Sequence, residues 1–338
     1  MSKISVIGAG AFGTSLAMHC KSLGFDVRVW CFEKDLPGIV AEKGENTIYL
    51  PGYTFSKSVR FVNDPLEAVE GADLVLFVPP SAHLRKTAEL FKGHITDKQL
   101  ILTATKGIEH GSCMLMSQVM EDIYPEFRDN MAFLSGPSFA KDVAAGYPTD
   151  LSCAAFDIEV AKKIQKMLHS SIIRIYTNDD VIGVELGGSV KNVLAIACGV
   201  SDELGFGLSA RAALMTRGLA EITRLGTAMG ANPLTFQGLS GVGDLILTCT
   251  GDLSRNRTLG KKLAEGKTAE EIVSSQTAVA EGYVTAKPVV QLAEKYGIEM
   301  PISEAVYKVC YEGADLKKSV LKLMNRSEKD EFEGINVC

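Results

Sequence analysis

A glycine-rich turn near the start of the chain constrains the fold more than any other feature of the sequence. The apolar run Ile4–Ile7 ends in G-A-G-A-F-G, which occupies residues 8–13. A helix-like segment, Thr14–Leu23, follows, and then a second apolar run, Val27–Trp30. Strand, glycine turn, helix and strand within about 30 residues form the context in which a G-x-G-x-x-G motif binds a dinucleotide.

Each glycine of this motif has its own expected role. Gly8 permits the tight turn, Gly10 lets the backbone approach a pyrophosphate, and Gly13 lets the helix pack close to the strand. The pyrophosphate then rests on backbone N–H groups at the helix N-terminus. The alternative is a plain tight turn, which an isolated motif of this kind often forms.

An acidic residue about 20 positions after the motif binds the adenosine ribose in such domains, and Glu33 stands near this place. A carboxylate there favours NAD, because it repels the 2′-phosphate of NADP. Lys34 would instead attract that phosphate, and both residues could simply begin a solvated helix. The expected cofactor is therefore NAD or NADP, with NAD slightly favoured by Glu33.

Apolar runs alternate with helix-like segments through the first half of the chain. Further strands are expected at residues 59–62, 73–78, 100–104, 131–134, 149–155 and 172–176, and further helices at 64–69, 81–91 and 158–168. Continuous apolar strands between helices predict an α/β fold with a doubly wound, mostly parallel sheet covered on both faces. From Val181 helical patterns dominate. We expect a Rossmann-like domain over residues 1–180 and an all-helical domain over 181–338, whose polar tail from 325 frays.

Ligands of such sheets bind beyond the carboxyl ends of the strands. This rule places the glycine turn, Pro79-Pro80, Lys106 and Gly136–Ser138 along one rim. Lys106 follows an expected strand and precedes Gly107, which makes it a candidate for contact with a ligand; an ordinary surface lysine in a loop is the alternative.

The helix expected over Glu185–Gly199 carries a lone lysine, Lys191. An apolar stripe suited to burial lies on another face and consists of Leu186, Val190, Leu194 and Ala197. The helical neighbours of Lys191 are all small, namely Gly187, Gly188, Ala195 and Cys198. Glycine inside a helix costs roughly 1 kcal/mol relative to alanine, so we expect a close approach there. We favour a substrate or the backbone of the cofactor domain as the approaching body, with another helix as the alternative.

A polar segment, Ser254–Arg257, precedes a helix-like run, Thr258–Ala264. Ser254 fits a helix N-cap, and Arg255 and Asn256 then fall in the first turn, where backbone N–H groups favour an anion. Arginine also offers a bidentate fork to phosphate. Two arginines and an asparagine here predict a phosphorylated substrate, with a basic solvated turn as the alternative.

That segment ends a longer stretch, residues 238–257, which looks rich in loops. The G-V-G at 241–243 lacks the lysine that follows in a phosphate-binding P-loop and does not follow a strand. We interpret it as backbone flexibility around Asp244, whose default role is a helix N-cap.

These parts together predict hydride transfer to the carbonyl carbon of a small phosphorylated compound. The carbonyl oxygen becomes an alkoxide as the hydride arrives, so it needs a proton or a cation beside it. Lys191 is the candidate general acid/base. Burial and a second cation, Lys106, would lower its pKa towards working pH.

Composition excludes several other classes. A net charge of −6 gives no reason to expect binding to nucleic acid or to an anionic membrane. The N-terminus runs straight into a strand without a signal peptide, and no apolar run approaches the roughly 18–20 residues that span a bilayer. The eight cysteines form no C-x-x-C pair and the five histidines show no ligand spacing. We therefore expect a reduced cytoplasmic protein without a metal site.

Several motifs, taken in order, resemble the NAD(P)-dependent glycerol-3-phosphate dehydrogenase family of bacterial type. They are G-A-G-A-F-G-T, T-A-T-K-G-I, L-S-G-P-S-F-A, E-L-G-G-S-V-K-N-V-L-A-I-A, G-L-S-G-V-G-D-L, S-R-N-R and A-E-G-Y. They run from residue 8 to residue 283. The combination of E-L-G-G-x-x-K-N with G-D-L and S-R-N is specific, whereas the first glycine motif is not.

The resemblance implies interconversion of dihydroxyacetone phosphate and sn-glycerol 3-phosphate, in the cytoplasm, for glycerophospholipid synthesis, by a homodimer. It implies that Lys191 is the proton donor and acceptor, with Asn192 and Asp244 beside it. The implied substrate contacts are Lys106, Gly136, Ser138, Lys191, Asp244, Ser254, Arg255 and Asn256. The implied cofactor contacts are Ala11, Phe12, Lys106, Ala140, Arg255, Val279 and Glu281.

One position departs from the family pattern, because bacterial relatives often carry histidine or arginine near position 32 or 33, where this chain has Phe32-Glu33. The departure leaves NADP preference open. Two alternative functions also stay open. One is another two-domain reductase with a catalytic lysine, of the β-hydroxyacid or ketopantoate type, although such an enzyme gives no reason for the S-R-N-R segment. The other is a protein that senses NAD(H) without chemistry and has no need of Lys191.

Overall fold

The computed structural model describes every residue except 1, 56–57, 276–278, 329, 332 and 335–338. The chain divides into two compact units, Met1–Thr105 with Met116–Val181, and Lys106–Leu115 with Ile182–Cys338. The sequence-based boundary after residue 180 differs from this division by one residue, Val181, and in one segment, Lys106–Leu115. That segment groups with the second unit because Ile108 and Leu115 form an isolated antiparallel bridge and bury their side chains in the second unit's core.

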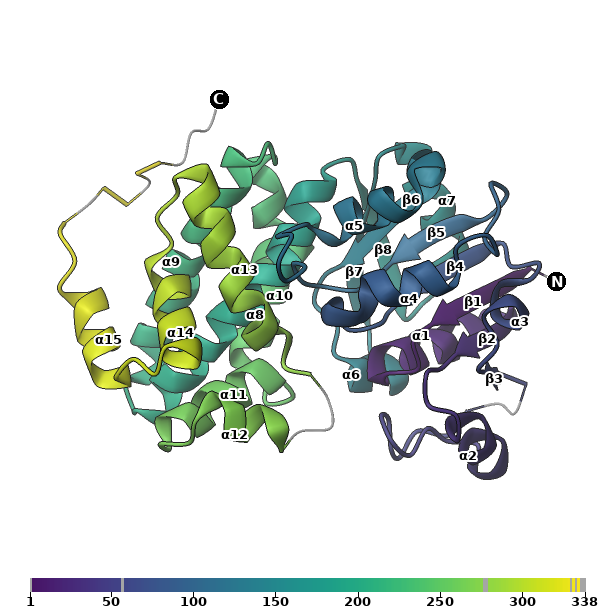
Figure 1. Ribbon diagram of the computed structural model, residues 1–338, viewed down its shortest axis with the longest axis horizontal. Helices are drawn as coiled ribbons and strands as arrows, with labels where there is room; N and C mark the ends of the chain where they lie inside the picture. The colour runs from purple at the N-terminus through teal and green to yellow at the C-terminus, as the bar shows by residue number, and fades with distance from the viewer. Residues whose placement is uncertain (1, 56–57, 276–278, 329, 332, 335–338) are drawn as a thin grey trace. The chain divides into compact units, whose positions relative to one another are not determined.

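The first unit is built on an eight-stranded sheet (Figure 1). In sheet order the strands are β3 (Arg60–Val62), β2 (Asp26–Trp30), β1 (Lys3–Ile7), β4 (Leu74–Phe77), β5 (Leu100–Thr103), β6 (Met131–Ser135), β7 (Thr149–Ala155) and β8 (Ile173–Asn178). Among the described strands of this sheet, only β6 and β7 pair antiparallel. This confirms the predicted doubly wound, mostly parallel sheet. The strand order reverses at β1 and β4, which is the switch point at which such sheets bind ligands.

Helices pack against this sheet and supply much of the first core. They are α1 (Ala11–Ser22), α2 (Leu36–Lys43), α3 (Pro65–Val69), α4 (Leu84–Leu90), α5 (Met116–Ile123), α6 (Ala140–Ala144) and α7 (Ile158–Leu168). Helices α2, α5 and α6 were not predicted from the sequence. Helix α2 carries Pro37 and Gly38, which are typical of turns, and α6 has only five residues, too few to show a periodic pattern.

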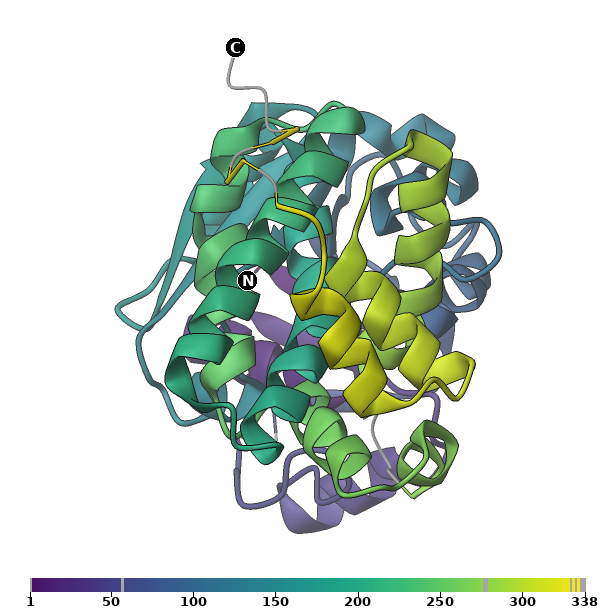
Figure 2. The same cartoon turned by 90° about the vertical axis from the view of Figure 1, so that its left-hand side faces the viewer.

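The described residues of the second unit form helices and connecting loops (Figures 1 and 2). The α-helices are α8 (Val181–Glu203), α9 (Gly207–Ala228), α10 (Asp244–Thr250), α11 (Arg255–Ala264), α12 (Ala269–Ser274), α13 (Glu281–Tyr296), α14 (Pro301–Tyr311) and α15 (Leu316–Met324). Leu186, Val190 and Leu194 of α8 are buried, as the apolar stripe predicts. The all-helical second domain is thus confirmed for the part of the chain described.

Residues 239–250, predicted to be rich in loops, are helical instead. A π-helical turn, η4 (Leu239–Gly243), runs directly into α10. Gly241 serves close packing and not flexibility, because a Cβ there would lie 2.1 Å from the carbonyl oxygen of Phe236. Asp244 is not the N-cap of α10, since Gly243 holds that position and the carboxylate of Asp244 binds two lysines.

Helix α8 corrects the expectation that no apolar run approaches the length that spans a bilayer. Among the described residues it is the one helix long and apolar enough to cross a bilayer by length and composition. Most of its apolar window is buried inside the protein, and a buried core helix passes the same test.

Candidate active site

The three glycines of the turn in the first unit have the geometry that their expected roles require: a tight turn, an approach to a pyrophosphate, and close packing of helix on strand. Gly8 has φ +117°, and a Cβ there would lie 3.0 Å from the backbone of Val78 and Pro79 at the end of β4. A Cβ on Gly13 would lie 2.0 Å from the carbonyl oxygen of Gly8. At Gly10, the N-cap of α1, an added Cβ would meet no atom within 4 Å. The space over Gly10 therefore lies where a pyrophosphate would approach the N–H groups of Ala11 and Phe12.

A buried asparagine, Asn46, holds this turn in place. Its Nδ2 donates to the carbonyl oxygen of Ala9 at 2.8 Å and to Thr14 Oγ1 at 2.9 Å. Its Oδ1 accepts from the N–H of Tyr49 at 3.1 Å. Asn46 was not predicted from the sequence, because one asparagine in a polar segment carries no periodic or motif signal.

Tyr49 also fixes the candidate ribose ligand, since its hydroxyl donates to Glu33 Oε1 at 2.6 Å. Desolvation and this hydrogen bond raise the pKa of Tyr49 to about 12, so it remains a donor at neutral pH. Asn63 Nδ2 donates to the carbonyl oxygen of Glu33 at 3.1 Å. Glu33 is half-buried and Lys34 is exposed. The carboxylate is therefore held in place beyond β2, where a ribose hydroxyl would be recognised.

The remaining sites expected in the first unit lie after β6. Gly136 has φ +127°, and Ser138 Oγ lies 3.2 Å from the carbonyl oxygen of Gly136. Ala140 begins α6. Strands β1, β4, β5 and β6 are parallel, so Gly8 and Gly136 follow the carboxyl ends at the same edge of the sheet. Lys106, expected at that rim, groups with the second unit.

Two lysines share one buried carboxylate in the second unit. Lys191 Nζ donates to Asp244 Oδ1 at 2.5 Å, and Lys106 Nζ donates to Asp244 Oδ2 at 2.7 Å. The Asp244 side chain is 1% exposed. Ser189, one turn before Asn192 on α8, ties the Lys106 segment to this helix by accepting from the N–H of Gly107 at 2.9 Å. Residues far apart in the sequence thus form one cluster with two positive charges and one negative charge.

Thr248 completes this cluster and was missed from the sequence. Its Oγ1 accepts from Lys191 Nζ at 2.7 Å and donates to the carbonyl oxygen of Asp244 at 2.7 Å. Because the hydroxyl proton points at that carbonyl, Thr248 acts only as an acceptor towards Lys191. The helical spacing of four residues from Asp244 was the available signal, but it has meaning only once Asp244 is known to lie in a helix.

These surroundings determine the ionisation of Lys191. Desolvation by burial lowers its pKa, the Asp244 carboxylate raises it, and the Lys106 ammonium lowers it again; the resulting pKa is about 8. An ordinary lysine titrates near 10.4. Lys191 can therefore exchange a proton near neutral pH, as a general acid/base must.

The N-terminus of α11 carries the candidate anion site. Ser254 is its N-cap, as predicted, and accepts from the N–H of Arg257 at 3.2 Å. Arg255 is exposed. The prediction of two available arginines is wrong, because Arg257 is buried and donates to Asp202 Oδ2 and Asp252 Oδ1, each at 2.7 Å.

Two asparagines connect this site to neighbouring helices. Asn256 Nδ2 donates to Asn192 Oδ1 at 2.9 Å, and Asn256 Oδ1 accepts from the N–H of Gly282 at 2.8 Å. Gly282 follows Glu281, the first residue of α13, and Val279 lies just before that helix. Although Arg255 as a residue is exposed, surrounding protein atoms partly desolvate its guanidinium and lower the pKa, and the Glu281 carboxylate opposes this effect. Three helices, α8, α11 and α13, thus meet beside the exposed Arg255.

Gly187 corrects another expectation about α8. A Cβ there would lie 2.6 Å from the carbonyl oxygen of Ser240 in η4. Packing between helices therefore requires this glycine, and the preferred expectation, clearance for a substrate or for the cofactor domain, is wrong at Gly187.

Among the described residues, no group of three or more His, Cys, Asp or Glu side chains could hold a metal ion.

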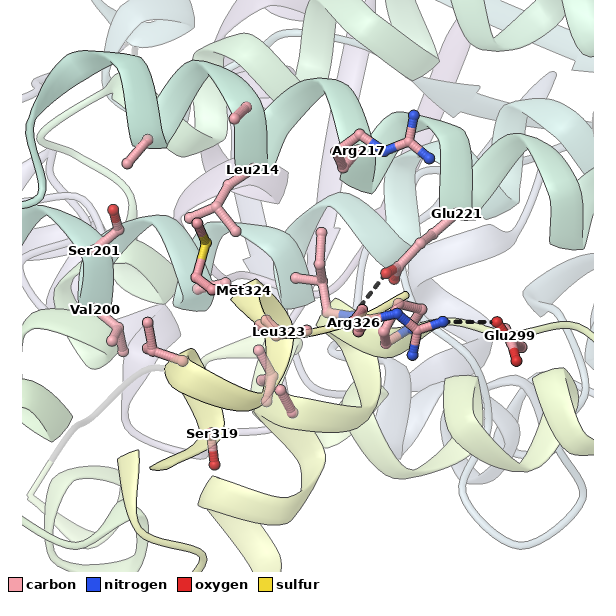
Figure 3. A pocket seen from close by; sticks show the side chains of 18 of the residues that line it. Val200, Ser201, Leu214, Arg217, Glu221, Glu299, Ser319, Leu323, Met324 and Arg326 are labelled. Atoms are coloured by element: carbon pink, nitrogen blue, oxygen red, sulfur yellow. Dashed lines mark hydrogen bonds and ion pairs between the residues drawn. The ribbon is translucent and has the colours of Figure 1, made fainter. Parts of the chain in front are cut away.

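A separate cavity of about 1090 Å³ lies elsewhere in the second unit, between α8, α9, α14 and α15 (Figure 3). Lys106, Lys191 and Asp244 do not line it. Its lining includes the buried Glu221, whose carboxylate accepts from the backbone N–H groups of Ile302 and Ser303 at the start of α14. Glu221 therefore satisfies the first turn of a neighbouring helix, which is a sufficient structural role.

Comparison with known proteins places these sites in a family. The sequence profile described as the N-terminus of NAD-dependent glycerol-3-phosphate dehydrogenase matches residues 3–161, and the profile of its C-terminus matches residues 180–321. The chain belongs to the NAD-dependent glycerol-3-phosphate dehydrogenase family. The resemblance drawn from the motifs is thereby confirmed.

Curated relatives in this family match along almost the whole chain. A glycerol-3-phosphate dehydrogenase [NAD(P)+] from Geobacter sp. (strain M21) is 46% identical over 330 residues, which cover 97% of this chain and 98% of the relative. The enzyme of the same name from Syntrophotalea carbinolica is 45% identical over 331 residues, which cover 98% of this chain and 99% of the relative.

Solved structures agree with this assignment. A glycerol-3-phosphate dehydrogenase from Coxiella burnetii has a TM-score of 0.91 at 40% identity and covers 96% of this chain and 99% of its own. A 2-dehydropantoate 2-reductase from Geobacter metallireducens has a TM-score of 0.62 at 15% identity and covers 92% of this chain and 100% of its own. The second likeness concerns the fold alone, so it does not support the alternative ketopantoate-type activity.

Proposed function

We propose that this chain catalyses reversible hydride transfer between NAD(P)H and dihydroxyacetone phosphate, giving sn-glycerol 3-phosphate for glycerophospholipid synthesis. The observation that carries the proposal is the cluster in which Lys106 and the buried Lys191 share the buried carboxylate of Asp244, and in which Lys191 has a pKa of about 8. The names of the full-length relatives support the same reaction.

In this proposal Lys191 gives a proton to the oxygen of the carbonyl as the hydride arrives, and takes it back in the reverse direction. The Lys191 ammonium has three N–H groups. Two of them donate to Asp244 and Thr248, both of which act as acceptors towards Lys191. In this proposal the third N–H group donates to the substrate oxygen. Lys106 adds positive charge beside the developing alkoxide, which stabilises the transition state. The bound nicotinamide supplies or accepts the hydride.

The substrate's phosphate is proposed to bind at the start of α11. Arg255 is exposed there, and the helix N-terminus adds partial positive charge. The substrate contacts in this proposal are Lys106, Gly136, Ser138, Lys191, Asp244, Ser254, Arg255 and Asn256, with Asn192 positioning Asn256. The cofactor contacts are Gly8, Gly10, Ala11, Phe12, Gly13, Glu33, Lys106, Ala140, Arg255, Val279 and Glu281.

Steady-state kinetics test the reaction. The purified protein should oxidise NADH or NADPH in the presence of dihydroxyacetone phosphate, and the ratio of kcat/KM for the two cofactors reports the preference that Glu33 is expected to set. Ketopantoate and a β-keto acid serve as competing substrates. Turnover of either keto acid without turnover of dihydroxyacetone phosphate would replace this proposal with the alternative reductase.

Replacing Lys191, the proposed acid/base, distinguishes an enzyme from a protein that only senses NAD(H). Lys191→Ala should lower kcat by about two orders of magnitude or more, on the usual scale of general acid/base catalysis, while the Kd for NADH stays within about twofold. Lys317→Ala, at an exposed position of α15, is the control. Equal loss of cofactor binding and of activity would mean that Lys191 has a structural role only.

We further propose that the protein acts as a cytoplasmic homodimer that neither inserts into membranes nor binds nucleic acid. The family resemblance supports the dimer, and the net charge of −6 supports the absence of nucleic-acid binding. Sedimentation equilibrium of the purified protein tests the dimer, since a single species with a mass near 36.3 kDa would contradict it.

A further inference from the structure

The start of α11 presents one exposed residue between buried ones. Ser254, Asn256 and Arg257 are buried, whereas Arg255 is exposed. Each buried neighbour has a defined partner: Ser254 caps the helix, Asn256 binds Asn192, and Arg257 binds Asp202. The direction of the Arg255 side chain is therefore determined by how firmly this turn is held.

Helix α8 holds the turn at two places. Asn192 lies next to Lys191, and Asp202 lies ten residues later on the same helix, about 15 Å away at the rise of an α-helix. Between them, α8 and α11 are in direct backbone contact. A Cβ on Gly199 would lie 2.0 Å from the carbonyl oxygen of Arg257, and one on Gly260 would lie 2.0 Å from that of Ile196.

Backbone contact stops α11 from moving closer to α8 but does not stop it from turning or moving away. The ion pair between Arg257 and Asp202 supplies that restraint. The Arg257 side chain is 9% exposed and that of Asp202 is 13% exposed. Arg211 of α9 lies 3.2 Å from both oxygens of Asp202 and fixes the carboxylate in turn.

We propose that the buried Asp202–Arg257 ion pair is a positioning element that aims Arg255 at the substrate's phosphate. The same helix, α8, carries the proton-transferring Lys191 and the anchor Asp202, so the pair sets the distance between the reacting carbonyl and the phosphate site. This inference rests on the proposed function, because it assumes that Arg255 binds the phosphate.

Arg257 provides its own control. Its second partner, Asp252, is 93% exposed, and an exposed ion pair contributes little. Asp202→Asn and Asp252→Asn therefore each remove the charge of one carboxylate that binds Arg257. The carboxylate of Asp202 is largely buried, whereas that of Asp252 is in water. Only the first change should disturb the turn.

The experiment uses the full chain with saturating NADH. Asp202→Asn should raise the KM for dihydroxyacetone phosphate by about tenfold or more with kcat changed less than about threefold, since lost phosphate binding affects the ground state and the transition state alike. The inhibition constant of inorganic phosphate should rise by a similar factor. Asp252→Asn should change both constants less than about twofold. Arg257→Lys, which keeps the charge but loses the fork, is the second variant should Asp202→Asn fail to fold.

A double-mutant cycle with Arg255→Ala identifies the route of the effect. If the pair acts through Arg255, Asp202→Asn should leave KM unchanged in the Arg255→Ala background. A full additional rise in KM there would overturn the inference, and so would an unchanged KM for Asp202→Asn alone. An unchanged KM for Arg255→Ala alone would instead refute the phosphate site of the proposed function.

Discussion

Lys191 illustrates how neighbouring residues determine the chemistry of one side chain. Its sequence environment, a lysine among small residues, identified it as a candidate acid/base. The pKa of about 8 comes from burial, opposed by Asp244 and assisted by Lys106, which lie 53 and 85 positions away along the chain. Lys106 was predicted as a site residue from its place after an expected strand, and Asp244 from the family resemblance, whereas Thr248 was not identified at all.

The pKa of Lys191 predicts opposite pH profiles for the two directions of the reaction. Reduction of dihydroxyacetone phosphate needs protonated Lys191, so kcat should fall as pH rises through about 8. Oxidation of sn-glycerol 3-phosphate needs the neutral amine, so kcat should rise through the same pH. Stopped-flow or steady-state rates between pH 6 and pH 10 test this, and profiles that rise or fall together would contradict it.

Two substitutions should move that midpoint in opposite directions. Asp244→Asn removes the charge that raises the pKa of Lys191, so the midpoint should shift to lower pH. Lys106→Met removes the charge that lowers it, so the midpoint should shift to higher pH. Both variants will be slower than the wild-type protein, which makes the midpoint and not the rate the useful readout. Shifts of the same sign would rule out this electrostatic account.

At the scale of elements, glycines determine how closely helices and strands approach one another. Gly13 brings α1 onto the end of β1, and Gly199 and Gly260 bring α8 onto α11. The sequence analysis assigned this role to Gly13 from the motif. It gave Gly187 the wrong partner, because a glycine in a helix pattern shows that something approaches but not what approaches.

The glycine turn allows a matched comparison of packing with ligand binding. Gly13→Ala places a methyl group against backbone and should lower the free energy of unfolding by about 1–3 kcal/mol or more. Gly10→Ala meets no protein atom within 4 Å and has φ −62°, which alanine adopts freely, so stability should stay within about 0.5 kcal/mol. Its methyl group lies where the pyrophosphate would approach, and the Kd for NADH should rise about tenfold. Unchanged NADH binding by Gly10→Ala would count against the dinucleotide site.

At the scale of the whole molecule, each unit has its own apolar core. One core combines the strands with α1 and α7, and the other combines α8 with α9, α11, α13 and α14. The glycine turn lies in the first unit and the Lys191 cluster lies in the second. The proposed pyrophosphate site at the glycine turn and the proposed proton-transferring Lys191 therefore belong to separately packed parts of the chain.

NADH should accordingly stabilise the two units unequally. At a concentration of about 100 times its Kd, a ligand stabilises what it binds by about 2.7 kcal/mol. Hydrogen exchange measured by mass spectrometry should show that NADH alone protects β1, the glycine turn and α1 more than α14 and α15. In Gly10→Ala this protection should weaken. Equal protection of these two groups of elements, or none, would contradict the proposed pyrophosphate site at the glycine turn.

The sequence by itself determined the order of the described strands, the mostly parallel α/β first unit, the helical character of the second unit and the main candidate residues. These features depend on local patterns, such as apolar runs, helix periodicity and turn residues, which act over a few residues. Only the tertiary structure decided that Asp244 joins two lysines and that Arg257 belongs to an ion pair. It also decided that Gly187 packs against a helix and that the Lys106 segment belongs to the second unit. Lys106 and Asp244 are 138 positions apart, and a contact at that separation depends on how whole elements pack, which no local pattern encodes.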